Sequence, residues 1–259
     1  MKGILMGLAA ILALPILFAG CSRPDPGPTT TKNFDFADFN KVEVNSAFEV
    51  ELVQSSTYSI MITAQERLFD QLSLTKSGET LQINLQWGWG TWVSSWGYQR
   101  PKARITMPDL NELKLSGASK GTVRGFRSSH DTNVFLSGAS SLDVDFEAYN
   151  SRIEVSGASR ITGRVKATGL SFQIDGASSA ELSGSSGKIN LEASGASRAS
   201  LESVAAGAVS VELSGASRAT VSPKDNMSVK ISGASSLTYT GSPSLDSIDV
   251  SGASTIHRK

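Results

Sequence analysis

All four tryptophans of this chain fall in one glycine-rich stretch between residues 86 and 99. With a neighbouring tyrosine they form an aromatic cluster of Trp87, Trp89, Trp92, Trp96 and Tyr98. Flat apolar rings with a polar edge suit stacking on sugars, or insertion at a membrane interface or a protein partner. Large aromatic side chains are also well buried on average, so rings such as Trp87 and Trp89 could instead pack under a hairpin and plug one end of the fold. The sequence leaves both alternatives open.

Four basic residues share one position relative to a repeated turn. The tetrapeptide Ser-Gly-Ala-Ser recurs through the C-terminal half, and the residue directly after it is basic in four copies, at Lys120, Arg160, Arg198 and Arg218. If the copies stack, these side chains form one row, here called the basic row, that suits an anionic glycan or the phosphates of lipopolysaccharide. The alternative is an ordinary solvated face whose charge is offset by neighbouring acids such as Asp143 and Glu181.

Residues suited to catalysis are few. The chain holds only two histidines, His130 and His257, so a serine, histidine and acid arrangement has little raw material despite the many serines. A polysaccharide-processing enzyme would need paired carboxylates, and five acids could approach one another across coils: Asp143, Asp145, Glu147, Glu154 and Glu181. Scattered acids are equally expected on any soluble solenoid. We therefore expect no enzymatic activity, no cofactor and no metal site.

The repeated turn defines the scaffold that must position these residues. Ser-Gly-Ala-Ser occurs seven times and its variant Asp175-Gly-Ala-Ser178 once, at intervals of 18 to 21 residues. This period is too short for helical repeats, and the asparagine-and-leucine signature of leucine-rich repeats is missing, so a β-helix fits best. The glycines that we expect to take positive φ at each bend are Gly117, Gly138, Gly157, Gly176, Gly195, Gly215, Gly233 and Gly252. The alanine that follows each glycine is expected to point into the corner.

Apolar residues alternate with polar ones on both sides of each turn, as at Ile153 and Val155 before one turn and Leu142 and Val144 after another. A period of two is typical of a half-buried strand. The sequence thus predicts an all-β fold, a parallel β-helix (β-solenoid) with about 19 residues per coil. Residues 111–259 form the regular coils. Residues 34–110 form irregular coils or a cap, with the aromatic hairpin at 86–99, so that 34–259 is a single solenoid.

The first residues indicate export. Lys2 followed by the apolar run Ile4 to Phe18 predicts a signal peptide over residues 1–20. The segment Leu17 to Cys21 resembles a bacterial lipobox, and Cys21, the only cysteine, is the expected lipid attachment site. Residues 21–33 are rich in proline and threonine and are expected to be a flexible tether. By resemblance to lipoprotein sorting rules, the serine that follows Cys21 suggests the outer membrane, with the periplasmic or the outer face left open.

The formal net charge is zero, which supplies no broad basic field for nucleic acid. The expected partners are therefore the membrane, through the lipid, and a glycan or another envelope or surface protein. The sequence does not indicate an oligomeric state.

Three features together resemble one known family, the putative auto-transporter adhesin, head GIN domain family. They are the opening Phe39 to Val53 (FNKVEVNSAFEVELV), the segment Met107-Pro108-Asp109-Leu110, and the repeated Ser-Gly-Ala-Ser turns. The resemblance covers residues 39–259 and implies a β-helical fold, a cell-envelope location and conjectured adhesion, with no catalytic residues to carry over. The aromatic cluster is not part of that pattern.

These observations favour a non-enzymatic, lipid-tethered envelope protein that binds or adheres, with the aromatic cluster as its first contact surface and the basic row as its second. Two alternatives remain from other classes of protein. One is a polysaccharide-processing enzyme on a β-helix scaffold, and the other is a purely structural envelope protein.

Overall fold

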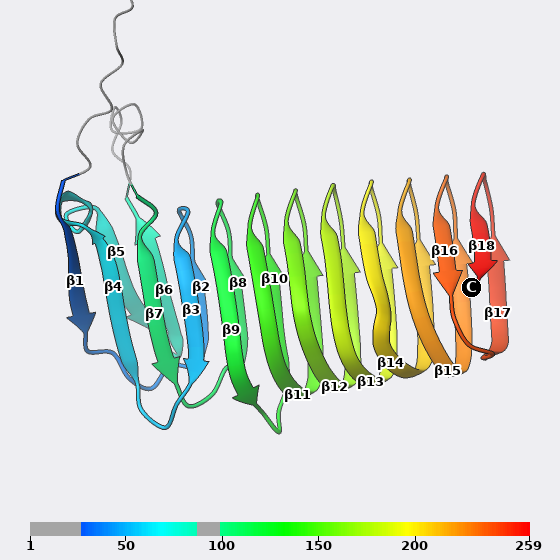
Figure 1. Ribbon diagram of the computed structural model, residues 1–259, viewed down its shortest axis with the longest axis horizontal. Helices are drawn as coiled ribbons and strands as arrows, with labels where there is room; N and C mark the ends of the chain where they lie inside the picture. Colours follow the sequence, from blue (N-terminus) through cyan, green and yellow to red (C-terminus); the bar gives the residue numbers. More distant parts are fainter. Residues whose placement is uncertain (1–26, 87–98) are drawn as a thin grey trace, which may run out of the picture.

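The computed structural model describes residues 27–86 and 99–259, and in these the chain winds into a rod of stacked coils (Figure 1). It is a parallel β-solenoid of about eight turns with about 19 residues per turn. The fold class expected from the repeat is therefore confirmed. Among the described residues no helix is long and apolar enough to cross a membrane.

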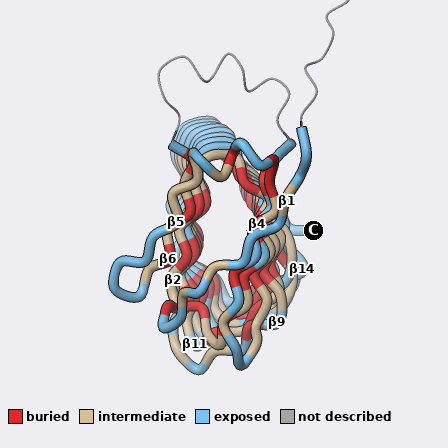
Figure 2. Tube along the Cα trace, turned by 90° about the vertical axis from the view of Figure 1, so that its left-hand side faces the viewer, coloured by how far each residue is buried: buried red, intermediate tan, exposed pale blue. Residues whose placement is uncertain are grey.

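Each regular coil has two flanks. A strand leaves one Ser-Gly-Ala-Ser turn along what we call the first flank, bends, and returns along the second flank to the next turn (Figure 2). Five long strands make both flanks in this way: β11 (Ser141–Val155), β12 (Arg160–Ile174), β13 (Ser179–Ala193), β14 (Arg198–Leu213) and β15 (Arg218–Ile231). Neighbours pair in parallel, so that Ser141 lies beside Arg160 and Val155 beside Ile174. Stacked positions are therefore 19 residues apart between β11, β12 and β13, and 17 to 20 residues apart between β13, β14 and β15.

The turn differs from expectation in which side chain it buries. The alanine was expected in the corner, but Ala158 is exposed and Ser159 is buried. The serine can point inward because its polar groups find partners there: the Ser140 hydroxyl donates to the Ser137 carbonyl oxygen at 2.9 Å, and the Ser140 backbone N–H donates to the Ser159 hydroxyl oxygen at 3.3 Å. A methyl group could not satisfy these backbone groups.

The turn glycine is required by its backbone angle and by its neighbour. Gly157 has φ of 76°, in the left-handed region, and a Cβ there would lie 2.4 Å from the carbonyl oxygen of Gly138 in the coil beside it. The same oxygen accepts a hydrogen bond from the Ala158 backbone N–H at 2.8 Å. All eight turn glycines predicted from the sequence have positive φ.

The core is a set of apolar ladders inside the coils (Figure 2). In one ladder, every member buried, each residue pairs with its counterpart in the adjacent coil: Val134, Ile153, Phe172, Leu191, Val211 and Val229. The buried cluster extends without interruption from Phe39 to Leu237. Because a single coil has no closed interior, burial of this core depends on stacking.

The N-terminal coils stack in an order that differs from their order in the chain. The first regular coil contains β8 (Glu112–Leu115) and β9 (Lys120–Arg127), followed by β10 (Thr132–Leu136). β8 and β9 pair in parallel with β2 (Lys41–Val44) and β3 (Glu49–Gln54). On their other side, β2 and β3 pair with β6 (Thr80–Leu85) and β7 (Lys102–Met107).

Antiparallel strands finish this end of the rod. β5 (Leu72–Ser77) pairs with β6, and β4 (Ser59–Gln65), followed by the short 3-10 helix η1 (Glu66–Leu68), pairs with β7. β1 (Thr29–Phe34) in turn pairs with β4. The tether predicted over residues 21–33 is therefore too long. Its β-branched threonines complete an otherwise open strand edge, and pairing along β4 compensates for the ordering of a segment without large apolar side chains.

The opposite end consists of β16 (Ser236–Tyr239), β17 (Ser244–Val250) and β18 (Thr255–Arg258). β17 pairs with β15 on the second flank, and β18 pairs with β16 on the first flank.

Candidate functional site

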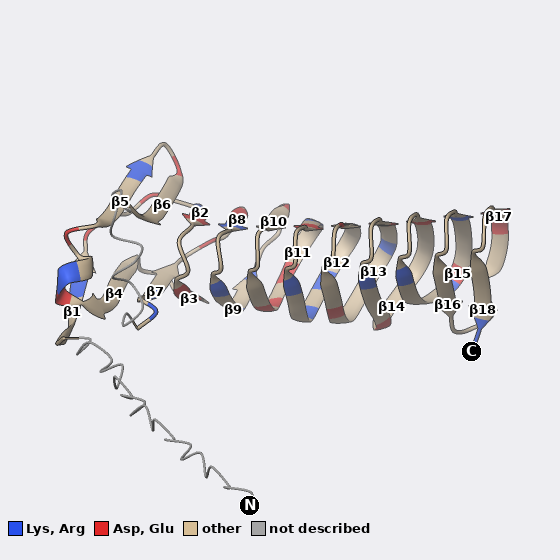
Figure 3. Ribbon diagram, turned by 90° about the horizontal axis from the view of Figure 1, so that it is seen from above, with Lys and Arg blue, Asp and Glu red and all other residues tan. Residues whose placement is uncertain are grey.

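The basic row forms as its spacing predicts. On the first flank Lys120 lies beside Ser141, Ser141 beside Arg160, and Arg160 beside Ser179. The line continues through Arg198 and Arg218 to Ser236. Lysine and arginine positions follow one another along the rod in Figure 3. Neighbouring strands are about 4.8 Å apart, so Lys120, Arg160 and Arg198 are spaced by about 9.6 Å, with Arg218 one further rung away.

The four cations of the row are exposed and lack anionic partners. None of Lys120, Arg160, Arg198 and Arg218 makes a side-chain hydrogen bond or an ion pair with any residue in the ranges 27–86 and 99–259. Arg198 and Arg218 are direct neighbours across two coils. Like charges placed directly opposite one another are unfavourable. Glu49 lies beside Lys120 in the register, so the members of the row without an acid beside them are Arg160, Arg198 and Arg218.

The acids expected to offset this row are engaged elsewhere or lie further away. Asp143 is held by Arg124, whose two terminal nitrogens lie 2.9 and 3.2 Å from its carboxylate oxygens. Glu181 is two residues after Ser179, the member of the row in that coil, and it lies beside Thr162 and Ser200. It makes no ion pair with a described residue. Asp143 therefore pairs with Arg124 and not with a cation of the basic row.

The five acids considered for catalysis do not gather at one point. Glu154 lies on the second flank beside Phe135 and Gln173, whereas the other four lie on or next to the first flank. Asp145 pairs with Arg127 at 3.7 Å, and Glu147 with Lys166 at 2.8 Å. The hydrogen bond from Lys166 lowers the pKa of Glu147. A glycosidase needs a carboxyl group with a raised pKa as its general acid, and the contact of Glu147 with Lys166 acts in the opposite sense.

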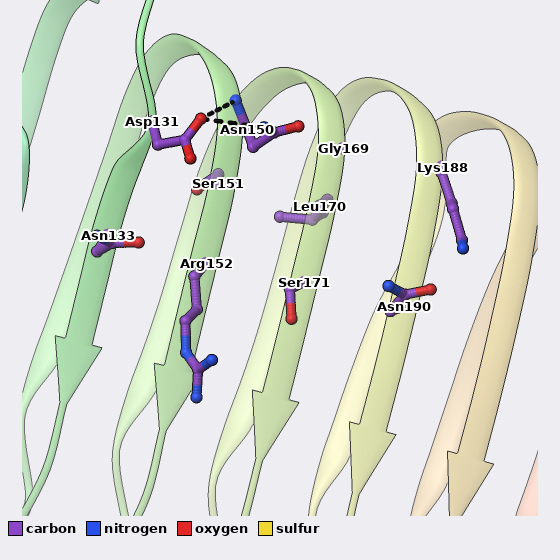
Figure 4. A pocket seen from close by; sticks show the side chains of 10 residues that line it. All are labelled: Asp131, Asn133, Asn150, Ser151, Arg152, Gly169, Leu170, Ser171, Lys188 and Asn190. Atoms are coloured by element: carbon purple, nitrogen blue, oxygen red, sulfur yellow. Dashed lines mark hydrogen bonds between the residues drawn. The ribbon is translucent and has the colours of Figure 1, made fainter.

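A polar hollow of about 210 Å³ lies on the second flank near the bend (Figure 4). Gly169 occupies the rung between Asn150 and Lys188, and the Asn150 side chain lies over it, with Oδ1 at 2.8 Å from the position that a Cβ of residue 169 would take. The lining residues are Asp131, Asn133, Asn150, Ser151, Arg152, Gly169, Leu170, Ser171, Lys188 and Asn190. Amide, hydroxyl and cationic groups around a small opening suit the hydroxyl groups of a sugar unit.

The sequence interpretation missed this hollow, although a signal was present. Asn133, Arg152, Ser171 and Asn190 are each 19 residues apart and stand side by side. The Asp131 carboxylate accepts hydrogen bonds from the backbone N–H and the side-chain amide of Asn150, at 3.2 and 3.0 Å. The period that repeats the turn also repeats every other position of the coil, so it predicts rows such as this one as well as the basic row.

Next to the hollow, His130 contacts the carboxylate of Asp109 through its Nε2 atom. Partial burial lowers the pKa of His130, but its hydrogen bonds to Asp109 and to the Asp131 carbonyl oxygen, together with the negative charges of these two aspartates, outweigh burial, so the pKa is raised. Partial burial likewise raises the pKa of Asp109, and hydrogen bonds from Ser128 and His130 reverse this, so that pKa is lowered. Both shifts favour a charged pair, which joins the segment before the first regular coil to the one after it.

Two predicted sites lie outside the described residues. These are the lipid attachment site Cys21 and the aromatic cluster of Trp87, Trp89, Trp92, Trp96 and Tyr98. The strands on either side of the cluster, β6 and β7, are described and end at the same edge of the rod as the turns.

The family model of the putative auto-transporter adhesin, head GIN domain, matches residues 38–243. The chain belongs to this family. The match spans β2 through β16, so it includes the irregular N-terminal coils and almost all of the regular ones. Membership in the GIN-domain family confirms the resemblance drawn from the opening segment and the repeated turns. An adhesin-like family suggests a protein of the cell surface or envelope.

Solved structures share the GIN-domain fold at low sequence identity. A protein of Parabacteroides distasonis described as a putative lipid binding protein matches with a TM-score of 0.84 and 16% identity, covering 91% of this chain and 98% of that chain. A putative adhesin of the same species matches with 0.81 and 16%, covering 90% and 98%. A putative adhesin of Parabacteroides merdae gives 0.80 and 18%, covering 91% and 98%. No curated protein matches the chain.

Proposed function

We propose that this chain is a non-enzymatic, lipid-tethered protein of the bacterial cell envelope that binds an extended anionic polymer, such as an acidic glycan, along its basic row. The pairing of Arg198 with Arg218 is the observation that carries this proposal. Two arginines side by side without an acid cost stability, and an anionic ligand across both would compensate that cost. Arginine also offers a planar fork that matches carboxylate, sulfate and phosphate groups.

The shape of the row favours a polymer over a small molecule. Its cations are spread over six consecutive coils of a straight flank, and they are not gathered around a cavity. A linear chain with a regularly repeated negative charge can contact several rungs at once. Each exposed contact is weak alone, and several in series give useful affinity.

The anchor belongs to the same proposal. Cys21 carries the lipid, the chain before β1 forms a short tether, and the outer membrane holds the rod. The family supports an envelope location in general. The names of the related structures, two putative adhesins and a putative lipid binding protein, support a binding role. The aromatic cluster remains a proposed second contact surface, through stacking on sugar rings.

The rival enzymatic function has less support. A polysaccharide-processing site needs acids and a base in one groove. Here the acids divide between two flanks. On the first flank, ion pairs with lysine or arginine engage Asp143, Asp145 and Glu147. A purely structural role would leave the uncompensated arginines of the row without a purpose.

Binding to a matched pair of probes tests the proposal. Dextran sulfate and uncharged dextran of equal length are immobilised, and the chain from Ser22 onward, which contains the whole described core, is passed over both. We expect binding to dextran sulfate only. Replacing Arg160, Arg198 and Arg218 together with serine should weaken it about tenfold or more, because three exposed ion pairs contribute up to about 1 kcal/mol each.

The control variant removes equal charge from other surfaces. Lys114→Ser, Lys224→Ser and Lys230→Ser together take away three cations that lie outside the basic row, two of them on the second flank. This triple variant should bind dextran sulfate nearly as the unaltered chain does. Equal losses in both triple variants would mean that net charge, and not the row, governs binding, and would contradict the proposal.

A further inference from the structure

The last coil exposes side chains that face inward. Leu245, Ile248 and Val250 of β17 are 46%, 49% and 45% exposed. They pair with Met227, Val229 and Ile231 of β15, which are 1% to 2% exposed. The three β17 residues are thus the final rungs of three core ladders, and no further coil of the described chain covers them. These residues are the largest group of exposed bulky apolar side chains among the described residues.

The same end also has open strand edges. Within the described chain, β17 pairs only with β15 and β18 only with β16, so the outer side of each strand has no backbone partner. The other end of the rod is finished by the antiparallel strands β1, β4 and β5. An uncovered edge above an apolar surface favours pairing with another strand.

The two open strands carry opposite charges. β17 contains Asp246 and Asp249 and has no lysine or arginine, whereas the segment from β18 to residue 259 contains Arg258 and Lys259 and has no acidic side chain. Lys259 also pairs with Glu202 of β14 at 2.7 Å, so Arg258 is the cation that remains at this edge. Within the coil these strands run in opposite directions on opposite flanks (Figure 1). The end face is therefore acidic along one edge and basic along the other.

We propose that a second copy of this chain covers this end, with the two rods joined C-terminal coil to C-terminal coil. The two copies are related by a two-fold axis that runs parallel to the strands. This axis places the second flank of each copy against the first flank of its partner, so that β17 of each copy lies antiparallel to β18 of the other. Acidic and basic edges then face each other, and both apolar surfaces are buried. A two-fold axis perpendicular to both the strands and the rod would instead set β17 against β17 of the partner and bring like charges together. Charge complementarity therefore selects the axis parallel to the strands.

Sedimentation equilibrium of the chain from Ser22 onward tests the association. We expect a dimer whose fraction increases with protein concentration. Ile248→Lys should shift the equilibrium to monomer without lowering the melting temperature of the monomer, because this side chain is half exposed there. Met61→Lys, at an exposed apolar residue of β4, is the matched control and should leave the dimer intact. A monomer at all concentrations, or equal effects of the two variants, would overturn the proposal.

Cross-linking distinguishes the two axes. The only cysteine, Cys21, is absent from the chain that starts at Ser22, so single cysteines can be placed freely. Ser247→Cys on β17 and His257→Cys on β18 are oxidised separately and as a mixture. We expect disulfide-linked dimers in the mixture and few in either sample alone. Efficient cross-linking of the Ser247→Cys chain to itself would overturn the pairing of β17 with β18 of the partner.

Discussion

Arg198 and Arg218 stand side by side on adjacent coils of the first flank, and neither makes an ion pair with a described residue. Other cations on the same flank do pair with acids, as Arg124 does with Asp143 and Lys166 with Glu147. The like-charge pair of Arg198 and Arg218 is unfavourable for stability, and the anionic ligand that we propose would compensate it.

Replacing Arg218 should raise the stability of the fold while it weakens binding of the proposed anionic ligand. We expect Arg218→Ser to raise the free energy of unfolding by about 0.2–1 kcal/mol, because a like-charge neighbour is removed. Arg160→Ser is the matched control, since Arg160 stands between Ser141 and Ser179 and has no such neighbour. Urea denaturation should show a gain for Arg218→Ser alone, while both variants bind dextran sulfate more weakly. A loss of stability in Arg218→Ser would contradict this reading.

The turn glycine should be needed for stacking as well as for its φ angle. Gly157→Ala is expected to lower the free energy of unfolding by more than the roughly 1–2 kcal/mol that a left-handed conformation costs a residue with a Cβ, because the new atom meets the Gly138 carbonyl oxygen. Gly125 has φ of 82° with open space around its Cβ position, so Gly125→Ala measures the conformational cost alone. Equal losses in thermal denaturation would show that stacking adds nothing.

The buried turn serines should contribute through their hydroxyl groups. Ser140→Ala removes the donor to the Ser137 carbonyl oxygen in a buried site, and we expect a loss of about 1–3 kcal/mol. The control is Ser179→Ala. Ser179 directly follows the turn serine of a later coil, and its side chain makes no hydrogen bond with a described residue. This substitution should change the free energy of unfolding by less than about 0.5 kcal/mol. Chemical denaturation of both variants gives the comparison, and an equal change would contradict it.

The His130 and Asp109 pair should give a pH-dependent contribution. Because the pKa of His130 is raised, its contribution to the free energy of unfolding is fully present below pH 6.5, the ordinary pKa value. This contribution is lost as the pH rises through the raised pKa. Because the pKa of Asp109 is lowered, its contribution to the free energy of unfolding is present above pH 3.8, the ordinary pKa value, and is lost as the pH falls through the lowered pKa. His130→Ala should therefore destabilise most near pH 5, by up to about 1 kcal/mol for so exposed a pair, and least above neutral pH. Melting temperatures at pH 5 and pH 9 measure this.

The control for that pair is a double variant. Asp109→Asn should remove the same dependence on pH, and adding His130→Ala to it should have little further effect. If the two substitutions are additive at pH 5, the contact between His130 and Asp109 does not stabilise the fold.

How far the sequence predicts this structure depends on how regular each part is. The near-constant interval between turns is enough to predict that Lys120, Arg160, Arg198 and Arg218 align, because a shift of one coil length preserves every side-chain direction. Composition alone did not show which turn residue is buried, since Ala158 is more apolar than Ser159 and only the backbone groups inside the corner decide between them.

The irregular end was less predictable for a topological reason. β6 and β7 pair outside β2 and β3 although they follow them in the chain, and alternation within a strand does not specify which neighbour it pairs with. The hollow was also not predicted, because its lining comes from different coils, with Asp131, Arg152 and Lys188 among the contributors.

The most direct test of the basic row is the salt dependence of its binding. The dissociation constant for dextran sulfate is measured from low to high sodium chloride with the unaltered chain and with the variant lacking Arg160, Arg198 and Arg218. We predict affinity that falls steeply with salt in the unaltered chain and a much shallower slope in the variant, because fewer counterions are displaced when three cations are gone. Equal slopes, or affinity that does not respond to salt, would contradict the account.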